Sequence, residues 1–165
     1  MTNKPYPHCH KLGSALHFHK PMEKFIDNAV YVLTKDFYLN KTKLFGKEIK
    51  IESHNAYSYD HIFKLDEPNL SDDQKKMRTK IAPQIKKLIN LVDKNECCDN
   101  ILTWTQVDSK SHNKKLYILC REVRLMVILI INKDFYHLRT AYFVDNDKML
   151  GKYIQLYTRY SGLKK

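Results

Sequence analysis

The stretch KKLYILCREVRLMVILIINKDFYHLRTAYFVDNDK (Lys114–Lys148) decides the fold, because polar breaks separate three runs of apolar, β-branched and aromatic residues. A fourth run of the same kind, ILTWTQV (Ile101–Val107), precedes it. The break Asn132–Asp134 is short enough for a hairpin between the last two runs. We therefore predict a four-stranded, mostly antiparallel sheet in the C-terminal half of the chain.

Helical periodicity dominates the residues before this sheet. Apolar residues recur at three- and four-residue spacing over 22–37, which predicts a helix beginning just after a proline. Ser71 and Gln74 form a capping-box pattern, and the apolar residues after them predict a second helix over about 72–92, kinked at Pro83.

Three shorter segments complete the predicted organisation. Residues 45–51 (FGKEIKI) indicate a short strand, and residues 57–65 alternate in a way that fits a strand or a helical segment. The amphipathic segment 150–160 predicts a closing helix. Helices followed by a sheet and a last helix indicate an α+β fold.

The composition fits one domain over 1–165, with a flexible polar segment at 1–20 and the folded part at 21–165. The chain carries 29 Lys and Arg against 18 Asp and Glu, a net charge of +11. This charge favours nucleic acid as a partner, with an acidic membrane or protein second and a merely solubilising surface as the alternative.

Membrane and secretory readings find little support in the sequence. The longest apolar run, LMVILII, is far shorter than the roughly 20 residues that span a bilayer, so we expect no membrane partner. No signal-like stretch opens the chain, so the four cysteines favour reduced thiols and a cytoplasmic location over disulfides.

Metal and nucleotide chemistry are disfavoured. The possible zinc ligands near the N-terminus are His8, Cys9, His10, His17 and His19. Their spacing matches no trusted zinc pattern, so we predict no metal and no cofactor, with a zinc site as the alternative. Four glycines in the whole chain leave no Gly-rich phosphate loop, and the acidic residues form no two-metal pattern.

Metal-independent cleavage of RNA remains open to the reactive side chains of one predicted strand. On a regular strand over 135–144, Leu138, Thr140 and Tyr142 share one face, and Arg139 joins them only if a bulge intervenes. His, Arg, Lys, Thr and Tyr can supply the base, the acid and the phosphate contacts of such a reaction. The alternative is that Thr140 and Tyr142 are ordinary strand formers.

The segment Lys114–Lys148 resembles the ribonuclease toxins grouped as barnase, EndoU, colicin and RelE-like, especially the phage-borne and polymorphic-toxin members. In that group helices precede a four-stranded antiparallel sheet, and a hydrophobic strand is followed by one ending in a TAY-like motif. Here the motif is Thr140–Tyr142, after Met126–Ile131. The likeness covers Tyr57–Tyr160 in the order of elements, but only about 30 residues in motif.

The resemblance implies a nuclease-like domain that cleaves RNA, such as tRNA or mRNA, by transesterification through the 2′-hydroxyl. It implies Thr140 and Tyr142 as phosphate contacts, His61 as general base or acid, and Arg124 as the basic residue, with Arg121 or Lys115 as substitutes. A core histidine and a surface arginine are the alternatives for His61 and Arg124. The residues expected to contact RNA are Lys75, Lys76, Arg78, Lys115 and Arg139.

Partners follow from the same reading. A cytoplasmic ribonuclease implies an inhibitor or immunity protein, which should be acidic to meet the +11 charge. Two other functions stay open: a non-catalytic nucleic-acid-binding module, and an immunity or interaction protein with an acidic protein partner.

Overall fold

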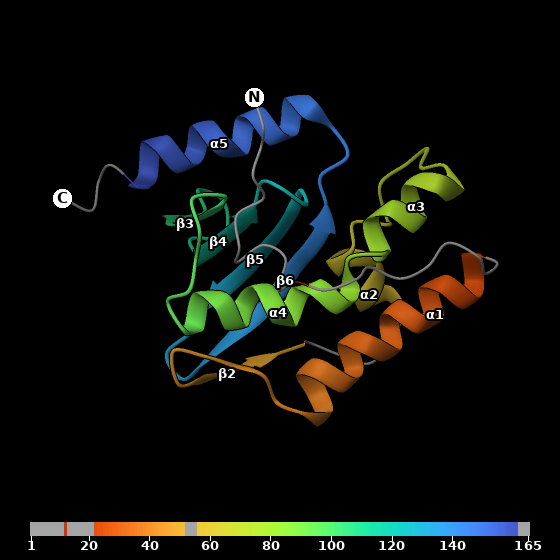
Figure 1. Cartoon of the computed structure of the whole chain (residues 1–165), viewed down its shortest axis with the longest axis horizontal. Helices are drawn as coiled ribbons and strands as arrows, with labels where there is room; N and C mark the ends of the chain where they lie inside the picture. The colour runs from red at the N-terminus through yellow and green to blue at the C-terminus, as the bar shows by residue number, and fades with distance from the viewer. Residues whose placement is uncertain (1–11, 13–21, 52–55, 162–165) are drawn as a thin grey trace.

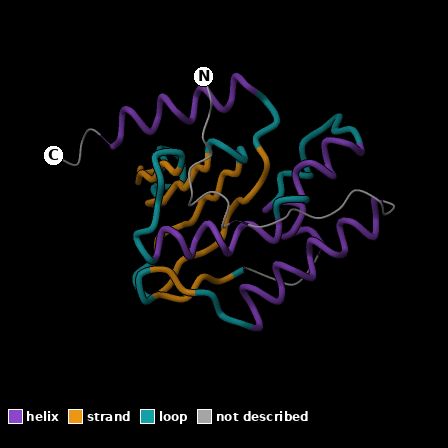
Figure 2. Tube along the Cα trace, in the orientation of Figure 1, coloured by secondary structure: helices purple, strands orange, loops and turns teal. Residues whose placement is uncertain are grey.

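The computed structural model describes residue 12 and residues 22–51 and 56–161. It is an α+β structure in which one sheet lies between helices on both of its faces (Figures 1 and 2). The elements in chain order are α1 (Met22–Leu33), the π-helical η2 (Thr34–Leu39), β1 (Lys43–Leu44), β2 (Lys47–Lys50), α2 (Ala56–Ile62), α3 (Asp72–Thr79), α4 (Ala82–Asp93), β3 (Ile101–Val107), β4 (Lys114–Cys120), β5 (Leu125–Ile131), β6 (Phe135–Phe143) and α5 (Asp147–Ser161).

The sheet has six strands in the order β1-β2-β6-β5-β4-β3. Its antiparallel part, β3 to β6, confirms the four predicted strands and the hairpin between the last two. The prediction of only four strands was wrong, because β1 and β2 extend the sheet and β2 runs parallel to β6. The short strand predicted over 45–51 is confirmed as β2, whereas β1 has only two residues, too few to show an alternation.

A tight turn separates β1 from β2. Phe45 and Gly46 have φ angles of 50° and 81°, the left-handed pair that a two-residue hairpin loop requires. Phe45 was predicted to be part of the strand but lies in this turn, where 58% of its surface is exposed. The Phe45 amide donates a hydrogen bond to Asp93 Oδ1 at 2.7 Å, which ties the turn to the end of α4.

The helices confirm the capping box and correct the helix that follows it. Ser71 accepts a hydrogen bond from the Gln74 amide at 3.1 Å, and Gln74 accepts one from the Ser71 amide at 2.9 Å. The single helix predicted over 72–92 is two helices, because Pro83 lacks an N–H and therefore lies in the first turn of α4. The ambiguous segment 57–65 forms α2 and a turn, and the closing helix is α5.

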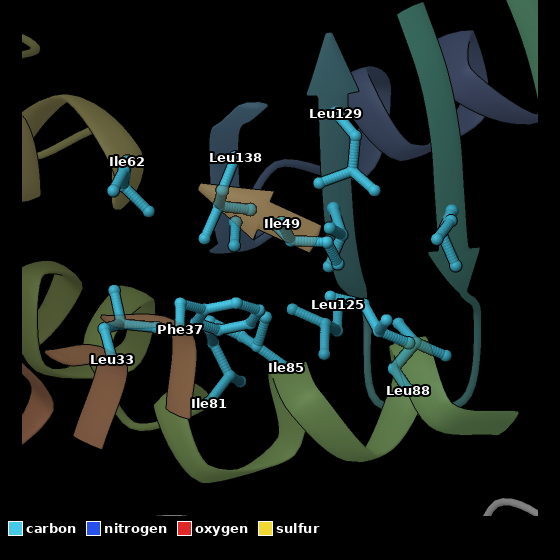
Figure 3. Close-up of a cluster of buried hydrophobic side chains, with 14 of the residues drawn as sticks. Leu33, Phe37, Ile49, Ile62, Ile81, Ile85, Leu88, Leu125, Leu129 and Leu138 are labelled. Atoms are coloured by element: carbon cyan, nitrogen blue, oxygen red, sulfur yellow. The ribbon is translucent and has the colours of Figure 1, made fainter. Parts of the chain in front are cut away.

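One face of the sheet, here called the helical face, packs against α1, η2 and α4. The buried contacts in Figure 3 join Leu33, Phe37, Ile81, Ile85 and Leu88 to Ile49, Leu125, Leu129 and Leu138. Full burial of such a side chain contributes roughly 1.5–3 kcal/mol. This larger of the two apolar clusters therefore supplies most of the apolar burial that stabilises the fold.

The opposite face of the sheet, here called the α5 face, is covered in part by α5 (Figure 1). Trp104 stacks on Tyr117 with ring centroids 5.0 Å apart, and Tyr157 of α5 meets the Trp104 ring edge-on at 6.1 Å. Tyr153 of α5 packs in the same cluster beside Tyr142. The last helix thus closes a second, smaller core.

A β-bulge decides which side chains of β6 face α5. Leu129 pairs with Leu138, but Ile128 pairs with Thr140, so Arg139 is an extra residue in β6. Leu138 therefore packs in the cluster of the helical face, while Tyr142 packs in the cluster of the α5 face. The prediction that these two side chains share one face was wrong, because a regular two-residue period was assumed.

Candidate nucleic-acid interface

The outer edge of β6 is divided between a strand and two helices. β2 pairs with β6 only from Phe135 to His137. Beyond that point α2 and α3 pack against β6. The turn between these helices brings Lys64 and Glu67 to the end of the strand, where both contact Arg78 of α3. We call this region, with His61, Lys64, Glu67, Arg78 and Tyr142, the α2–α3 corner.

Arg78, a predicted RNA contact, lies inside the corner with 6% of its side chain exposed. Its Nε and Nη2 donate to the two oxygens of Asp145 at 3.0 and 3.3 Å, and its Nη1 donates to Glu67 Oε2 at 3.0 Å and the Lys64 carbonyl at 2.7 Å. Burial alone would lower the pKa of Arg78, but the hydrogen bonds to Asp145 and Glu67 outweigh it and raise the pKa. These contacts give Arg78 a role in holding the turn against β6.

Tyr142, a predicted phosphate contact, is buried beneath α5 and the corner. Its hydroxyl lies 2.9 Å from that of Tyr153, and the Lys64 Nζ lies 4.6 Å from the centre of its ring. Burial, together with Tyr153, raises the pKa of Tyr142 far above the ordinary value for a tyrosine. Thr140, two residues earlier, is 5% exposed. Both hydroxyls therefore lie within the packed fold, where substrate would have to displace neighbouring residues to reach them.

His61 lies in the last turn of α2, and about one-third of its side chain is exposed. Its Nδ1 lies 3.1 Å from Asp66 Oδ2. A carboxylate that accepts from Nδ1 orients the ring and leaves Nε2 as the nitrogen that exchanges a proton. Burial first, and the charge of Asp66 second, raise the pKa of the neighbouring Asp60, whereas Lys75 opposes the increase. Lys75, a predicted cation, thus lies close enough to Asp60, the residue before His61, to act on its pKa.

Lys64 adds an unusual cation to the corner. Its backbone has a φ of 54°, the left-handed region that is costly for a residue with a side chain. Burial lowers the pKa of its ammonium, although Glu67 acts in the opposite direction. No sequence signal singled out Lys64, because its position depends on the turn between α2 and α3.

Arg124 belongs to a different cluster, at the turn between β4 and β5. Its Nη2 lies 2.7 Å from Asp147 Oδ1, close enough for an ion pair but without hydrogen-bond alignment. The guanidinium carbon of Arg124 lies 5.7 Å from the centre of the Phe143 ring. Lys80 Nζ lies 5.0 Å from the centre of the same ring. A cavity of about 240 Å³ borders these three residues and Gln84. Arg124 thus interacts with the start of α5 and the end of β6.

A row of polar and basic side chains crosses the α5 face beyond the buried cluster. Strand pairing aligns one residue from each of five strands: Lys50, His137, Ile130, Lys115 and Gln106. Directly paired residues project from the same face of a sheet. Lys50 is exposed and the other four are half-buried, whereas the neighbouring row through Trp104, Tyr117, Ile128 and Thr140 is buried.

The row continues into an aromatic side chain and the bulge. Lys50 Nζ lies 4.7 Å from the centre of the Phe135 ring. The bulge sets Arg139 together with Thr140 opposite Ile128, next to the row. We call Lys50, Phe135, His137, Arg139 and Lys115 the basic strip. Lys115 and Arg139 were predicted as RNA contacts; Lys50 and His137 were missed, because their alignment needs the parallel pairing of β2 with β6.

Carboxylates also lie beside the strip, among them Glu48, which pairs with Phe135, and Asp108. Lys115 donates to Asp108 Oδ2 at 2.7 Å, and this bond, with two backbone amides, holds the pKa of Asp108 far below its usual range. The pair is half-buried, with 17% of the Lys115 side chain and 28% of the Asp108 side chain exposed. Asp108 therefore orients Lys115 and balances part of its charge.

The remaining predicted sites lie elsewhere. Lys75 and Lys76 are half-buried on α3. The histidines and Cys9 of the proposed zinc alternative lie outside the described residues. Within the described residues, no group of three or more His, Cys, Asp or Glu side chains is placed to hold a metal. No helix in that part of the chain is both long and apolar enough to cross a bilayer.

Comparisons with models of protein families, with curated proteins and with solved structures gave no match to this chain. The resemblance to ribonuclease toxins therefore stays a prediction.

Proposed function

We propose that the protein binds single-stranded RNA across the basic strip. The observation that carries the proposal is the register that sets Lys50, His137 and Lys115 in one row outside the buried cluster of the α5 face. Adjacent strands lie about 4.8 Å apart, so the row spans several nucleotides of an extended backbone. The net charge of +11 draws a polyanion toward this face.

Phe135 favours a single strand over a duplex. Its ring is half-buried at the end of the strip, and the Lys50 ammonium lies over the ring. Single-stranded nucleic acids bind where a basic groove follows the backbone and aromatic rings stack on unpaired bases. The strip therefore supplies both elements of this mode of binding.

Fluorescence anisotropy with a labelled single-stranded RNA of about 20 nucleotides tests the proposal. Lys50→Glu and Arg139→Glu should each weaken binding on the order of tenfold and reduce the slope of log affinity against log salt by about 1. Lys35→Glu is the matched control: it makes the same change in charge at an exposed residue of η2, in the layer on the other face. Equal losses in all three variants would show that net charge, and not the strip, drives binding.

Cleavage of the bound RNA is a second candidate function, favoured by the His61–Asp66 pair. In this reaction His61 would remove the proton of the ribose 2′-hydroxyl, and Asp66 would stabilise the imidazolium that forms. The 2′-oxygen would then attack phosphorus, the bond to the 5′-oxygen would break, and that leaving oxygen would take a proton from water. The products would be a 2′,3′-cyclic phosphate and a free 5′-hydroxyl. Lys75, whose charge acts on the neighbouring Asp60, is the predicted cation that we assign to the phosphate.

Incubation with total cellular RNA in EDTA tests cleavage separately from binding. His61→Ala should abolish fragments with cyclic-phosphate ends, and Asp66→Asn should reduce them by about tenfold or more. Thr140→Ala should change the rate little, because Thr140 is buried. Intact RNA at excess wild-type protein that binds it would identify a binding module without this activity. A protein that does cleave cellular RNA requires an inhibitor, for which an acidic protein fits the +11 charge.

A further inference from the structure

The strand β3 forms a long open edge of the sheet. It is the last strand in the order β1-β2-β6-β5-β4-β3 and has seven residues (Figure 1). The other edge strand, β1, has only two residues, and α5 packs against β3 through Trp104, on the α5 face of the sheet. An open edge of this length presents backbone donors and acceptors that can pair with another chain.

Two hydrogen bonds at the ends of the β3–β4 ladder show which residues of β3 bond to β4. The Asp108 amide donates to the Asn113 carbonyl at 2.9 Å, and the Arg121 amide donates to the Asn100 carbonyl at 2.8 Å. In an antiparallel pair, every second residue exchanges hydrogen bonds with its partner, and the residues between point their backbone groups outward. The even-numbered residues of β3 therefore bond to β4.

The outward groups belong to the odd-numbered residues. The Ile101 amide is used, since it donates to the Cys98 carbonyl at 3.0 Å. For Thr103, Thr105 and Val107, no backbone hydrogen bond outside the ladder is found among the described residues. These three residues thus offer three N–H and three C=O groups along one straight edge.

The sequence of β3 has none of the features that usually block such an edge. ILTWTQV contains no proline and no charged residue, and its pairing with β4 is regular throughout. Val107, at its end, is 58% exposed. Within the part of the chain that the structure describes, the strand is therefore open for pairing both in backbone geometry and in side-chain character.

We propose that the β3 edge binds an extended, acidic segment of a partner protein, which adds a seventh strand to the sheet. Exposed basic residues on β4 and just after it, Lys114 and Arg121, lie near the two ends of the edge. With a net charge of +11, a negatively charged segment is attracted, whereas a second copy of the chain brings +11 of its own and is repelled. In strand addition of this kind, backbone hydrogen bonds supply the affinity. Charge and the alternate side chains of the added strand supply the specificity.

Selection from a random peptide library displayed on phage, with the whole protein as bait, tests the proposal. Enriched peptides should be net negative and rich in β-branched residues, and they should bind with the same affinity when single-stranded RNA is present on the basic strip. Failure to enrich any peptide, or enrichment of basic or helical ones, would overturn the proposal.

Thr105→Pro tests the edge, with Thr105→Val as the matched control. Proline removes the outward N–H of residue 105 without removing a bond to β4, so the ladder is kept. Thr105→Val keeps that N–H and nearly the same shape. The selected peptide should lose about tenfold or more in affinity for Thr105→Pro and less than about threefold for Thr105→Val.

Amide hydrogen exchange keeps the test decisive if Thr105→Pro folds poorly. In the wild-type protein, the peptide should slow exchange at Thr103, Thr105 and Val107, while Trp104 and Gln106 are already protected by β4. Protection elsewhere with no change at these three amides would overturn the proposal. Dimerisation through the same three amides in the absence of peptide would also overturn it, in favour of a second copy as the occupant.

Discussion

Tyr142 has a hydroxyl that interacts within the protein rather than with solvent. The hydroxyl forms a hydrogen bond with that of Tyr153 under α5, and the Lys64 ammonium lies over the Tyr142 ring. Because burial raises its pKa, the Tyr142 phenol stays protonated at neutral pH and cannot accept a proton from a substrate. The residue therefore links β6 to α5 and to the α2–α3 corner.

Tyr142→Phe should lower the free energy of unfolding by about 1 kcal/mol, because the buried Tyr153 hydroxyl loses its partner. Urea denaturation measures this change. Tyr31→Phe is the control, since Tyr31 is 65% exposed and should give no measurable loss. RNA affinity should stay unchanged in both variants; a loss of affinity in Tyr142→Phe alone would contradict the structural role and restore Tyr142 as an RNA contact.

The sequence identified residue types better than residue positions. His61 was chosen from the resemblance to the ribonuclease toxins, and the structure supplies its partner, Asp66, five residues later in the chain. Arg78 was chosen for its charge, but its burial depends on Asp145, which is distant in the chain. Such long-range contacts have no local pattern, so sequence could not separate a buried arginine from a solvated one.

The capping box at the start of α3 was visible in the sequence, and its contribution is measurable. Ser71→Ala should cost about 1 kcal/mol of stability, because it removes the acceptor of the Gln74 amide. Chemical denaturation gives the value. Ser109→Ala, at an exposed loop position, is the control. An unchanged unfolding free energy in Ser71→Ala would mean that water satisfies the end of the helix equally well.

The bulge in β6 leads to a prediction about deletion. Removing Arg139 should leave Leu138 on the helical face and Tyr142 on the α5 face, because the deleted residue is the extra one. The near-ultraviolet circular dichroism of the aromatic cluster should therefore persist. Deleting Ala141 instead should abolish it, since a one-residue shift moves every later side chain to the opposite face. Loss of the signal in both deletions would contradict this register.

The length of each helix or strand decided whether the sequence could predict it. Seven- to nine-residue strands gave clear signals, and the capped helix start was found. The bulge, the two-residue strand β1 and the parallel pairing of β2 with β6 were missed. A single extra residue or a two-residue strand changes too few positions to show a period, and parallel pairing joins segments that are distant in the chain.

The molecule as a whole should be sensitive to alkali, because burial raises the pKa of several tyrosines. That of Tyr117 rises from 10.0 to about 12, chiefly through burial. The unfolded chain loses this proton first, so stability is complete below about pH 10 and falls as the pH rises toward about 12. Urea denaturation across this range should show the fall, and Tyr117→Phe should make it shallower. A constant unfolding free energy would contradict the burial of these hydroxyls.

The parallel pairing of β2 with β6 constrains the order in which the protein can fold during its synthesis. Lys47–Lys50 leave the ribosome early, yet their neighbours, Phe135–His137, follow only after more than half of the chain has been translated. At roughly 5–20 residues per second, the first hairpin waits several seconds beside an unfinished sheet. Chaperones that shield apolar segments thus have a defined window to act on this N-terminal portion, and it ends when β6 emerges.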